Sequence, residues 1–185
     1  MLCIDGCPKE IKAEDTDFAS TTMKEEKLIK LLKELIRNSR RSDRELAKAL
    51  KVSQPTVTRN RKLAESFIRS YTIVPEFKKI GYEIFAITFA KAKTYDKKQG
   101  ETKRELAKKW VMSFPNVFFA SDGEGLGKDA VILSLHKDYS KYADFMRQYT
   151  VNFADFASDV QSFIVSLKTG MIIKPFDLTY LAEDL

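Results

Sequence analysis

The residues of this chain that could do chemistry are mostly basic, and they gather in one segment. Between Lys24 and Arg69 there are 14 Lys and Arg residues against 6 Asp and Glu residues, an excess of eight positive charges. Residues 1–23 carry an excess of three negative charges, and residues 70–185 an excess of one positive charge. Positive charge confined to one segment is typical of a surface that binds nucleic-acid phosphates, although charge alone fits a solvated helix face equally well.

Side chains suited to base edges and phosphates lie in the middle of this segment. If Val57 and Ala64 face a core, a polar set on the same stretch turns outward. Gln pairs with adenine, Arg with guanine or phosphate, and Ser or Thr with either, while arginines ahead of the stretch are placed to hold phosphates. The predicted DNA-binding residues are Arg40, Arg41, Arg44, Ser53, Gln54, Thr56, Thr58, Arg59 and Lys62.

Two helices are expected ahead of this stretch. The spacing of a capping box at Thr22–Glu25 and at Ser42–Glu45 marks two helix starts. Apolar residues then recur with the period of an amphipathic helix, and the first helix is expected to end near Ser39 and the second near Lys51.

A third helix is expected to carry most of the outward-facing residues. Ser53 can cap it, Pro55 is tolerated in its first turn because the amides there lack partners, and it should run to about Ser66. Two short helices separated by a tight turn have the outline of a helix-turn-helix. A plain three-helix bundle is the alternative, although a face selected only for solubility would mix Glu with its Lys and Arg.

Beyond Gly81 the pattern changes to short strands alternating with helices. The segment Tyr71–Val74 is β-branched and aromatic, and is expected to form a linking strand. The later elements are expected at Phe85–Phe89 (strand), Thr102–Pro115 (helix), Val117–Ala120 (strand), Val131–Leu135 (strand), Tyr139–Tyr149 (helix) and Phe163–Leu167 (strand). The order βαββαβ is that of a ferredoxin-like unit, whose helices cover one face of an antiparallel sheet. A further strand at Met171–Leu178 would lie at the uncovered face.

Three stretches resemble one protein family in combination. Glu45–Arg59 holds the helix-turn-helix, Ile68–Pro75 a Tyr-Thr linking strand, and Lys79–Tyr82 an Ile-Gly-Tyr step. Together they look like the Lrp/AsnC family of feast/famine regulators, and resemble its archaeal branch most closely, over residues 24–170. The resemblance implies an α+β fold, with a winged helix-turn-helix domain followed by a ferredoxin-like domain, and a DNA-binding transcriptional regulator as the function.

The resemblance also implies partners. In the family two sheets pack face to face in a homodimer, which presents two recognition helices to a palindromic or near-palindromic DNA site, and dimers associate further. An amino-acid effector binds between subunits at the glycine-rich stretch that corresponds to Ser121–Asp129. The effector-binding residues carried over are Gly125, Gly127 and Asp129. The residues alone also fit a flexible hairpin loop, and Lys128 stands where the family has an aromatic residue.

Two departures from the family bear on DNA affinity. Lys51 stands in the turn between the two DNA-facing helices, where the family often has Gly, and a left-handed residue there costs about 1 kcal/mol. The stretch Arg61–Ile68 is about two residues shorter than the family's pattern. A small-molecule-sensing module with weak or lost DNA binding is therefore the alternative function. An RNA-binding or metabolic protein is disfavoured, because no strand has an aromatic-basic signature.

Other chemistry finds little support in the sequence. His136 is the only histidine and is expected to be structural, so neither a metal site, a cofactor nor an enzymatic activity is predicted. Cys3 and Cys7 are expected to be reduced thiols. No apolar run approaches the length of a membrane span, and the acidic N-terminus lacks a signal-peptide core, so a cytoplasmic location is expected.

Four regions are expected from these patterns. Residues 1–22 form an N-terminal extension, and residues 23–69 form the helix-turn-helix domain. Residues 70–82 form the linking strand and hinge, and residues 83–185 form the ferredoxin-like regulatory and dimerisation domain.

Overall fold

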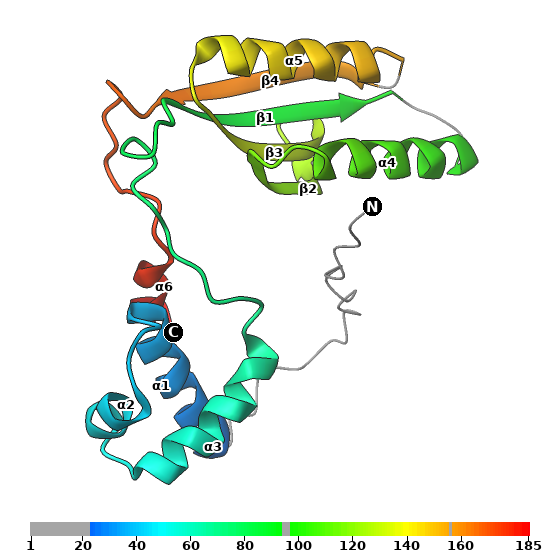
Figure 1. Cartoon of the computed structure of the whole chain (residues 1–185). Helices are drawn as coiled ribbons and strands as arrows, with labels where there is room; N and C mark the ends of the chain where they lie inside the picture. The colour runs from blue at the N-terminus through cyan, green and yellow to red at the C-terminus, as the bar shows by residue number, and fades with distance from the viewer. Residues whose placement is uncertain (1–22, 94–96, 156) are drawn as a thin grey trace, which may run out of the picture. The chain divides into compact units, whose positions relative to one another are not determined.

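The chain folds into two compact units. The computed structural model describes residues 23–93, 97–155 and 157–185. The first unit comprises residues 23–73 and 176–185, and the second comprises residues 74–175. The chain therefore leaves the first unit and returns to it, so two connections join the units. Figure 1 labels the helices and strands of both.

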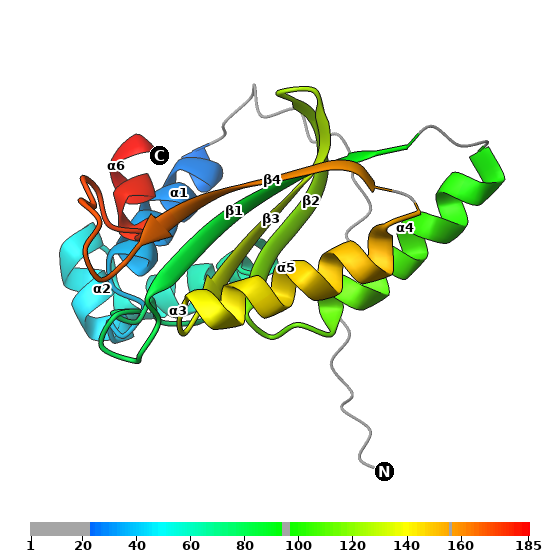
Figure 2. The same cartoon turned by 90° about the horizontal axis from the view of Figure 1, so that it is seen from above.

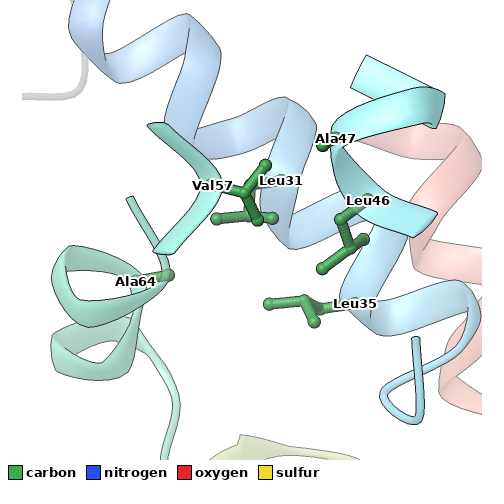
Figure 3. Close-up of a cluster of buried hydrophobic side chains, with 6 residues drawn as sticks. All are labelled: Leu31, Leu35, Leu46, Ala47, Val57 and Ala64. Carbon is green, nitrogen blue, oxygen red and sulfur yellow. The ribbon is translucent and has the colours of Figure 1, made fainter. Parts of the chain in front are cut away.

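Three helices make up most of the first unit. They are α1 (Met23–Arg37), α2 (Asp43–Leu50) and α3 (Gln54–Ala64), and a short 3-10 turn, η1 (Glu65–Phe67), follows them. Each helix turns its apolar stripe inward. Figure 3 shows the buried side chains that they share, which are Leu31, Leu35, Leu46, Ala47, Val57 and Ala64. The three predicted helices are confirmed, although Thr22, the expected cap of the first, lies outside the described residues.

The C-terminal residues also belong to the first unit. η2 (Leu178–Tyr180) and α6 (Leu181–Asp184) pack against α1, and Ala182 is completely buried. The Arg37 guanidinium donates to Glu183 Oε1 from Nε and Nη2, at 3.2 and 2.8 Å. Residues 176–185 thus belong to the first unit, whereas the sequence patterns assign them to the ferredoxin-like domain. The strand expected at Met171–Leu178 is wrong, because no described strand pairs with that segment.

The second unit has the predicted βαββαβ order. Its elements are β1 (Ile84–Ala92), α4 (Lys97–Met112), β2 (Val117–Gly125), β3 (Lys128–His136), α5 (Tyr139–Phe153) and β4 (Ala157–Ser166). The four strands form an antiparallel sheet in the order β2-β3-β1-β4. This is the ferredoxin-like arrangement, and the α+β prediction is confirmed.

One face of this sheet is covered by α4 and α5 (Figure 2). Alternate residues of β1 (Ala86, Thr88 and Ala90) are buried on that face. An aromatic cluster fills the space between the helices and the sheet, in which the Trp110 ring lies 4.4 Å from that of Phe114 and 5.3 Å from that of Phe145, measured between centroids. This cluster is the core of the second unit.

The opposite sheet face, here called the open face, is apolar, and no described helix of the second unit covers it. One row crosses all four strands, because Phe119 pairs with Leu133, Leu133 with Ile87, and Ile87 with Phe163. The Phe163 side chain is 64% exposed and that of Phe119 49% exposed. A contiguous apolar row at this level of exposure is typical of an interface.

Two sequence predictions about strands in the first half fail. Tyr71–Val74 is not a strand, because no described strand lies beside it to take up its backbone hydrogen bonds. The wing is also absent from the described chain, since every strand there belongs to the sheet of the second unit. β-branched residues favour a strand only where a partner strand exists.

Several element boundaries in the second unit also differ from expectation, and β4 begins at Ala157 rather than at Phe163. α4 begins at Lys97 rather than at Thr102, since Lys, Gln and Glu are good helix formers there. The loop expected over Ser121–Asp129 shrinks to a two-residue turn, because β2 continues to Gly125 and β3 starts at Lys128. The turn residues Leu126 and Gly127 have φ of 53° and 68°, which matches the positive pair of a type I′ hairpin.

The packing of the C-terminal residues on α1 can be tested with two neighbouring substitutions. Ala182→Glu places a carboxylate at a fully buried position, and is expected to lower the free energy of unfolding of the helical unit by about 1–3 kcal/mol. Glu183→Gln weakens an ion pair whose Glu side chain is 74% exposed, and is expected to cost less than about 1 kcal/mol. Urea denaturation followed by far-UV circular dichroism gives both values. Equal effects would contradict the described packing.

Candidate nucleic-acid interface

The start of α2 is fixed by the predicted capping box. The Ser42 hydroxyl accepts from the Glu45 N–H at 3.3 Å, and the Glu45 carboxylate accepts from the Ser42 hydroxyl and N–H, both at 2.7 Å. The hydrogen bond from the Ser42 hydroxyl, and to a lesser extent the one from its backbone N–H, lowers the pKa of Glu45. The box satisfies amides that have no partner inside the helix and so sets where α2 begins.

The turn between α2 and α3 depends on a left-handed residue. Lys51 has φ 54° and ψ 44°, as the turn chemistry predicts. The Val52 N–H then donates to Ala47 O at 3.0 Å, which closes the end of α2. A lysine adopts this conformation less readily than glycine does. The tight turn between α2 and α3 therefore forms with a lysine at its left-handed position, which lowers the stability of the fold relative to glycine there.

The start of α3 is capped as predicted. The Ser53 hydroxyl accepts from the Thr56 N–H at 3.3 Å and lies 2.7 Å from the Thr56 hydroxyl. Val57 and Ala64 are buried against the core of the unit, while α3 contains no acidic residue. The exposed side of α3 is therefore basic and polar.

Five of the nine predicted DNA-binding side chains are both exposed and without a partner in the described chain. They make no hydrogen bond or ion pair with any residue that the structure describes, and they are Arg40, Arg44, Gln54, Arg59 and Lys62. Gln54, Arg59 and Lys62 come from α3, Arg44 from the first turn of α2, and Arg40 from the segment before α2. Their polar groups are available to an external ligand.

The other four predicted side chains already have partners. Arg41 forms an ion pair with Glu34, which also accepts from Arg37 Nη1 at 2.6 Å. The Thr58 hydroxyl donates to Asp43 Oδ2 at 2.6 Å, and Ser53 and Thr56 bond to each other. These four residues help to build the surface, and each keeps further donors or acceptors for a ligand.

Asp43 and Arg61 join α2 to α3, and sequence reasoning missed them. Asp43 Oδ1 lies 3.0 Å from Arg61 Nε, although that N–H does not point at the oxygen, and Arg61 Nη2 donates to Arg41 O at 2.8 Å. Asp43 thus holds both Thr58 and Arg61. The sequence offers only that Asp43 lies in the first turn of α2, where an acid is favourable for the helix dipole anyway.

The predicted effector residues lie at the β2–β3 hairpin of the second unit. Gly125, with φ 153°, ends β2, and Gly127, with φ 68°, is the second residue of the turn. Asp129 Oδ2 accepts from the Ala92 N–H at 2.8 Å, which ties the hairpin to the end of β1. Lys128 is buried, and its hydrogen bond to Asp159 lowers the pKa of that carboxyl. Lys128 therefore points away from solvent and fastens β3 to β4.

His136 is buried and has partners on both ring nitrogens. Nε2 lies 2.9 Å from the Ser134 hydroxyl and Nδ1 3.4 Å from Asn116 Nδ2. Burial lowers the pKa of His136. The described residues hold no group of three or more His, Cys, Asp or Glu placed to bind a metal ion, and Cys3 and Cys7 lie outside them. Among the described helices, none is long and apolar enough to cross a membrane.

A family model matches the first part of the chain, and a curated relative matches about half of the chain. Residues 29–63 match the AsnC-type helix-turn-helix domain, which spans α2 and most of α1 and α3. The HTH-type transcriptional regulator LrpC of Bacillus subtilis is 33% identical over 93 residues. That stretch spans 49% of this chain and 60% of LrpC.

Solved structures match both units together. The structure of B. subtilis LrpC has a TM-score of 0.62 at 24% identity, and the match covers 80% of this chain and 96% of LrpC. Escherichia coli AsnC has a TM-score of 0.63 at 19% identity, with 82% and 96% covered. The regulator NMB0573 of Neisseria meningitidis, solved as a complex with L-Met, has a TM-score of 0.65 at 19% identity, with 84% and 97% covered. The fold of this chain is that of these regulators.

The cost of the left-handed lysine can be tested against a matched control. Lys51→Gly is expected to raise the free energy of unfolding of the helical unit by about 0.5–1 kcal/mol, because relief of the left-handed strain exceeds the added entropy of the unfolded chain. Lys48→Gly, one turn earlier in the same helix, is expected to lower it by about 1 kcal/mol. Thermal and urea unfolding measure both. A loss of stability in Lys51→Gly would contradict the described turn.

Proposed function

We propose, on the premise that this chain carries an AsnC-type helix-turn-helix domain on the fold of the Lrp/AsnC regulators, that it is a sequence-specific DNA-binding transcriptional regulator of that type. One observation carries the proposal. The exposed side of α3 presents Gln54, Arg59 and Lys62 with no acidic residue on the helix and no partner within the described chain.

In this proposal α3 enters the major groove of DNA. Gln54 and Arg59 read base edges, since a carboxamide suits adenine and a guanidinium suits guanine. Lys62, Arg40 and Arg44 hold phosphates, which positions the helix. Ser53, Thr56, Thr58 and Arg41 lie at the same surface in spite of their partners within the described chain, and each makes one further contact with bases or backbone.

A homodimer, with the open faces of two sheets packed together, is part of the proposal. It is supported by the uncovered row of Phe119, Leu133, Ile87 and Phe163. Covering exposed apolar side chains with a second copy removes them from water, which favours association. A symmetric dimer presents two α3 helices, so the DNA site is expected to be palindromic. Further association of dimers belongs to the same proposal.

An amino-acid effector at the β2–β3 hairpin is the regulatory part of the proposal. The exposed backbone of Gly125 and Gly127 leaves room for close approach of a carboxylate, and Asp129 follows them. The L-Met complex of NMB0573 is a finding about that protein, and it supports an amino acid as the class to test first.

The remaining parts of the proposal rest on the sequence. Membership of the archaeal branch is supported by Glu45–Arg59 together with the Ile-Gly-Tyr step at Ile80–Tyr82. We also propose a cytoplasmic protein that is not an enzyme and needs no cofactor, because the relatives are transcriptional regulators.

One observation favours a second candidate, a ligand-sensing module with weak or lost DNA binding. α3 ends at Ala64 and gives way to a 3-10 turn, before the expected end at Ser66. A shorter recognition helix offers fewer phosphate contacts. Thermal stabilisation by amino acids without any DNA binding at low salt would select this candidate.

Two arginine substitutions separate base reading from phosphate holding. Arg59→Ala is expected to cost about 1–3 kcal/mol on the preferred site and much less on random DNA. Arg44→Ala is expected to weaken both alike and to reduce the slope of log affinity against log salt by about one. Gel shifts at several salt concentrations measure both, with Lys30→Ala on α1 as the charge-matched control. Equal losses for Arg59→Ala on all DNA would contradict base reading by this residue.

The dimer is tested by a charge on the open face. Phe163→Glu is expected to convert the dimer into a monomer, because a carboxylate would be buried unpaired in the interface. Val151→Glu is the control, since Val151 is 74% exposed on α5, away from that face. Light scattering coupled to size exclusion gives the mass. A dimer that survives Phe163→Glu would contradict face-to-face packing.

A further inference from the structure

A cavity of about 320 Å³ lies in the second unit. Its walls come from the end of β3, the first turns of α5 and the segment that leads into β2. The volume is at the lower end of the range for small-molecule pockets. The β2–β3 hairpin lies at the opposite end of β3, roughly 25 Å away for a nine-residue strand. The cavity is therefore separate from the effector residues proposed above.

The floor of the cavity is apolar and aromatic. The rings of Phe114 and Phe145 form it, and Phe145 is buried. The rings of Phe114 and Phe145 both pack at a tilt against that of Trp110, which anchors them in the core of the unit. A rigid aromatic floor favours a flat or branched apolar ligand group, because such a group gains contact area without losing much entropy on either side.

The charged side chains that line the cavity leave it net positive. Lys137 Nζ donates to Ile80 O at 2.7 Å and lies 3.9 Å above the Tyr82 ring, and no described carboxylate pairs with it. Lys141 has no side-chain partner among the described residues. The one lining carboxylate, Asp144, is paired with Arg147 at 2.8 Å. The electrostatic field at the cavity therefore favours an anion.

Neutral polar groups complete the lining. Gln148 lies two turns after Lys141 on the same side of α5, and its carboxamide has no partner in the described chain. Asn116 uses one amide N–H on His136 and keeps its other N–H and its oxygen. These groups and Lys141 provide several donors around one end of an apolar cavity.

We infer that this cavity binds a small organic monoanion, a carboxylate carried on an aromatic or branched apolar body. Lys141 forms a charge-assisted hydrogen bond with the carboxylate, Asn116 and Gln148 add neutral ones, and Phe114 and Phe145 hold the body. Inorganic phosphate fills only a small part of the volume and leaves the aromatic floor exposed. The site lies wholly within the second unit and does not depend on DNA binding by the first.

The single tryptophan of the chain reports on the floor of the cavity, since Trp110 contacts two of its residues. We expect phenylacetate to change the tryptophan fluorescence of the full-length chain saturably. Phenethylamine has a similar aromatic group but carries a positive charge, and inorganic phosphate is an anion with no apolar group. Neither is expected to bind. An equal response to phenethylamine would contradict the preference for an anion. Binding of inorganic phosphate would contradict the need for an apolar body. The absence of any response to phenylacetate would contradict the site itself.

Substitutions at the exposed Lys141 test the charge without disturbing the core. Lys141→Gln is expected to weaken phenylacetate binding about tenfold, the effect of losing one charge-assisted hydrogen bond. Lys141→Glu is expected to reverse the preference, so that phenethylamine binds and phenylacetate does not. Lys108→Gln removes an exposed charge from α4 and serves as the control, with unchanged affinity. If Lys141→Gln matches this control, the fluorescence response comes from elsewhere and the assigned site is wrong.

Discussion

The burial of one side of α3 against α1 and α2 is the constraint on which the interface depends. Val57 and Ala64 are almost fully buried there, and burying a side chain such as Val stabilises a fold by about 1.5–3 kcal/mol. Because the helix repeats every 3.6 residues, fixing the buried side also fixes the exposed one. Gln54, Arg59 and Lys62 must then face outward, and a rotation of α3 that hid them would bury unpaired charge.

The two faces of the sheet in the second unit have different roles. α4 and α5 cover one face and enclose the aromatic core, so the inferred ligand cavity lies on that side. The open face carries the row of Phe119, Leu133, Ile87 and Phe163, which is the surface assigned to a second copy in the proposed dimer. The proposed dimer and the inferred ligand site therefore use different surfaces, and in the proposed dimer the pairing of the open faces sets the spacing of the two α3 helices.

Local chemistry made much of this structure predictable. The capping box of Ser42 and Glu45, the left-handed Lys51 and the βαββαβ order all follow from residues close together in the chain. The predictions failed where the structure of a segment depends on a partner that is distant in the sequence. Tyr71–Val74 has strand propensity but no strand beside it, and the C-terminal segment around Ala182 packs on α1 across nearly the whole chain length. The Asp43–Thr58 hydrogen bond is likewise tertiary, so the sequence carries no sign of it.

Selection of binding sites from a pool of random duplex DNA by the purified full-length chain, repeated at increasing salt, tests the central claim most directly. If α3 reads bases and the open faces pair, the selected sequences should converge on two inverted half-sites, and their advantage over random DNA should persist as salt weakens all binding. Failure to enrich any sequence, or enrichment that disappears together with non-specific binding, would contradict a sequence-specific regulator.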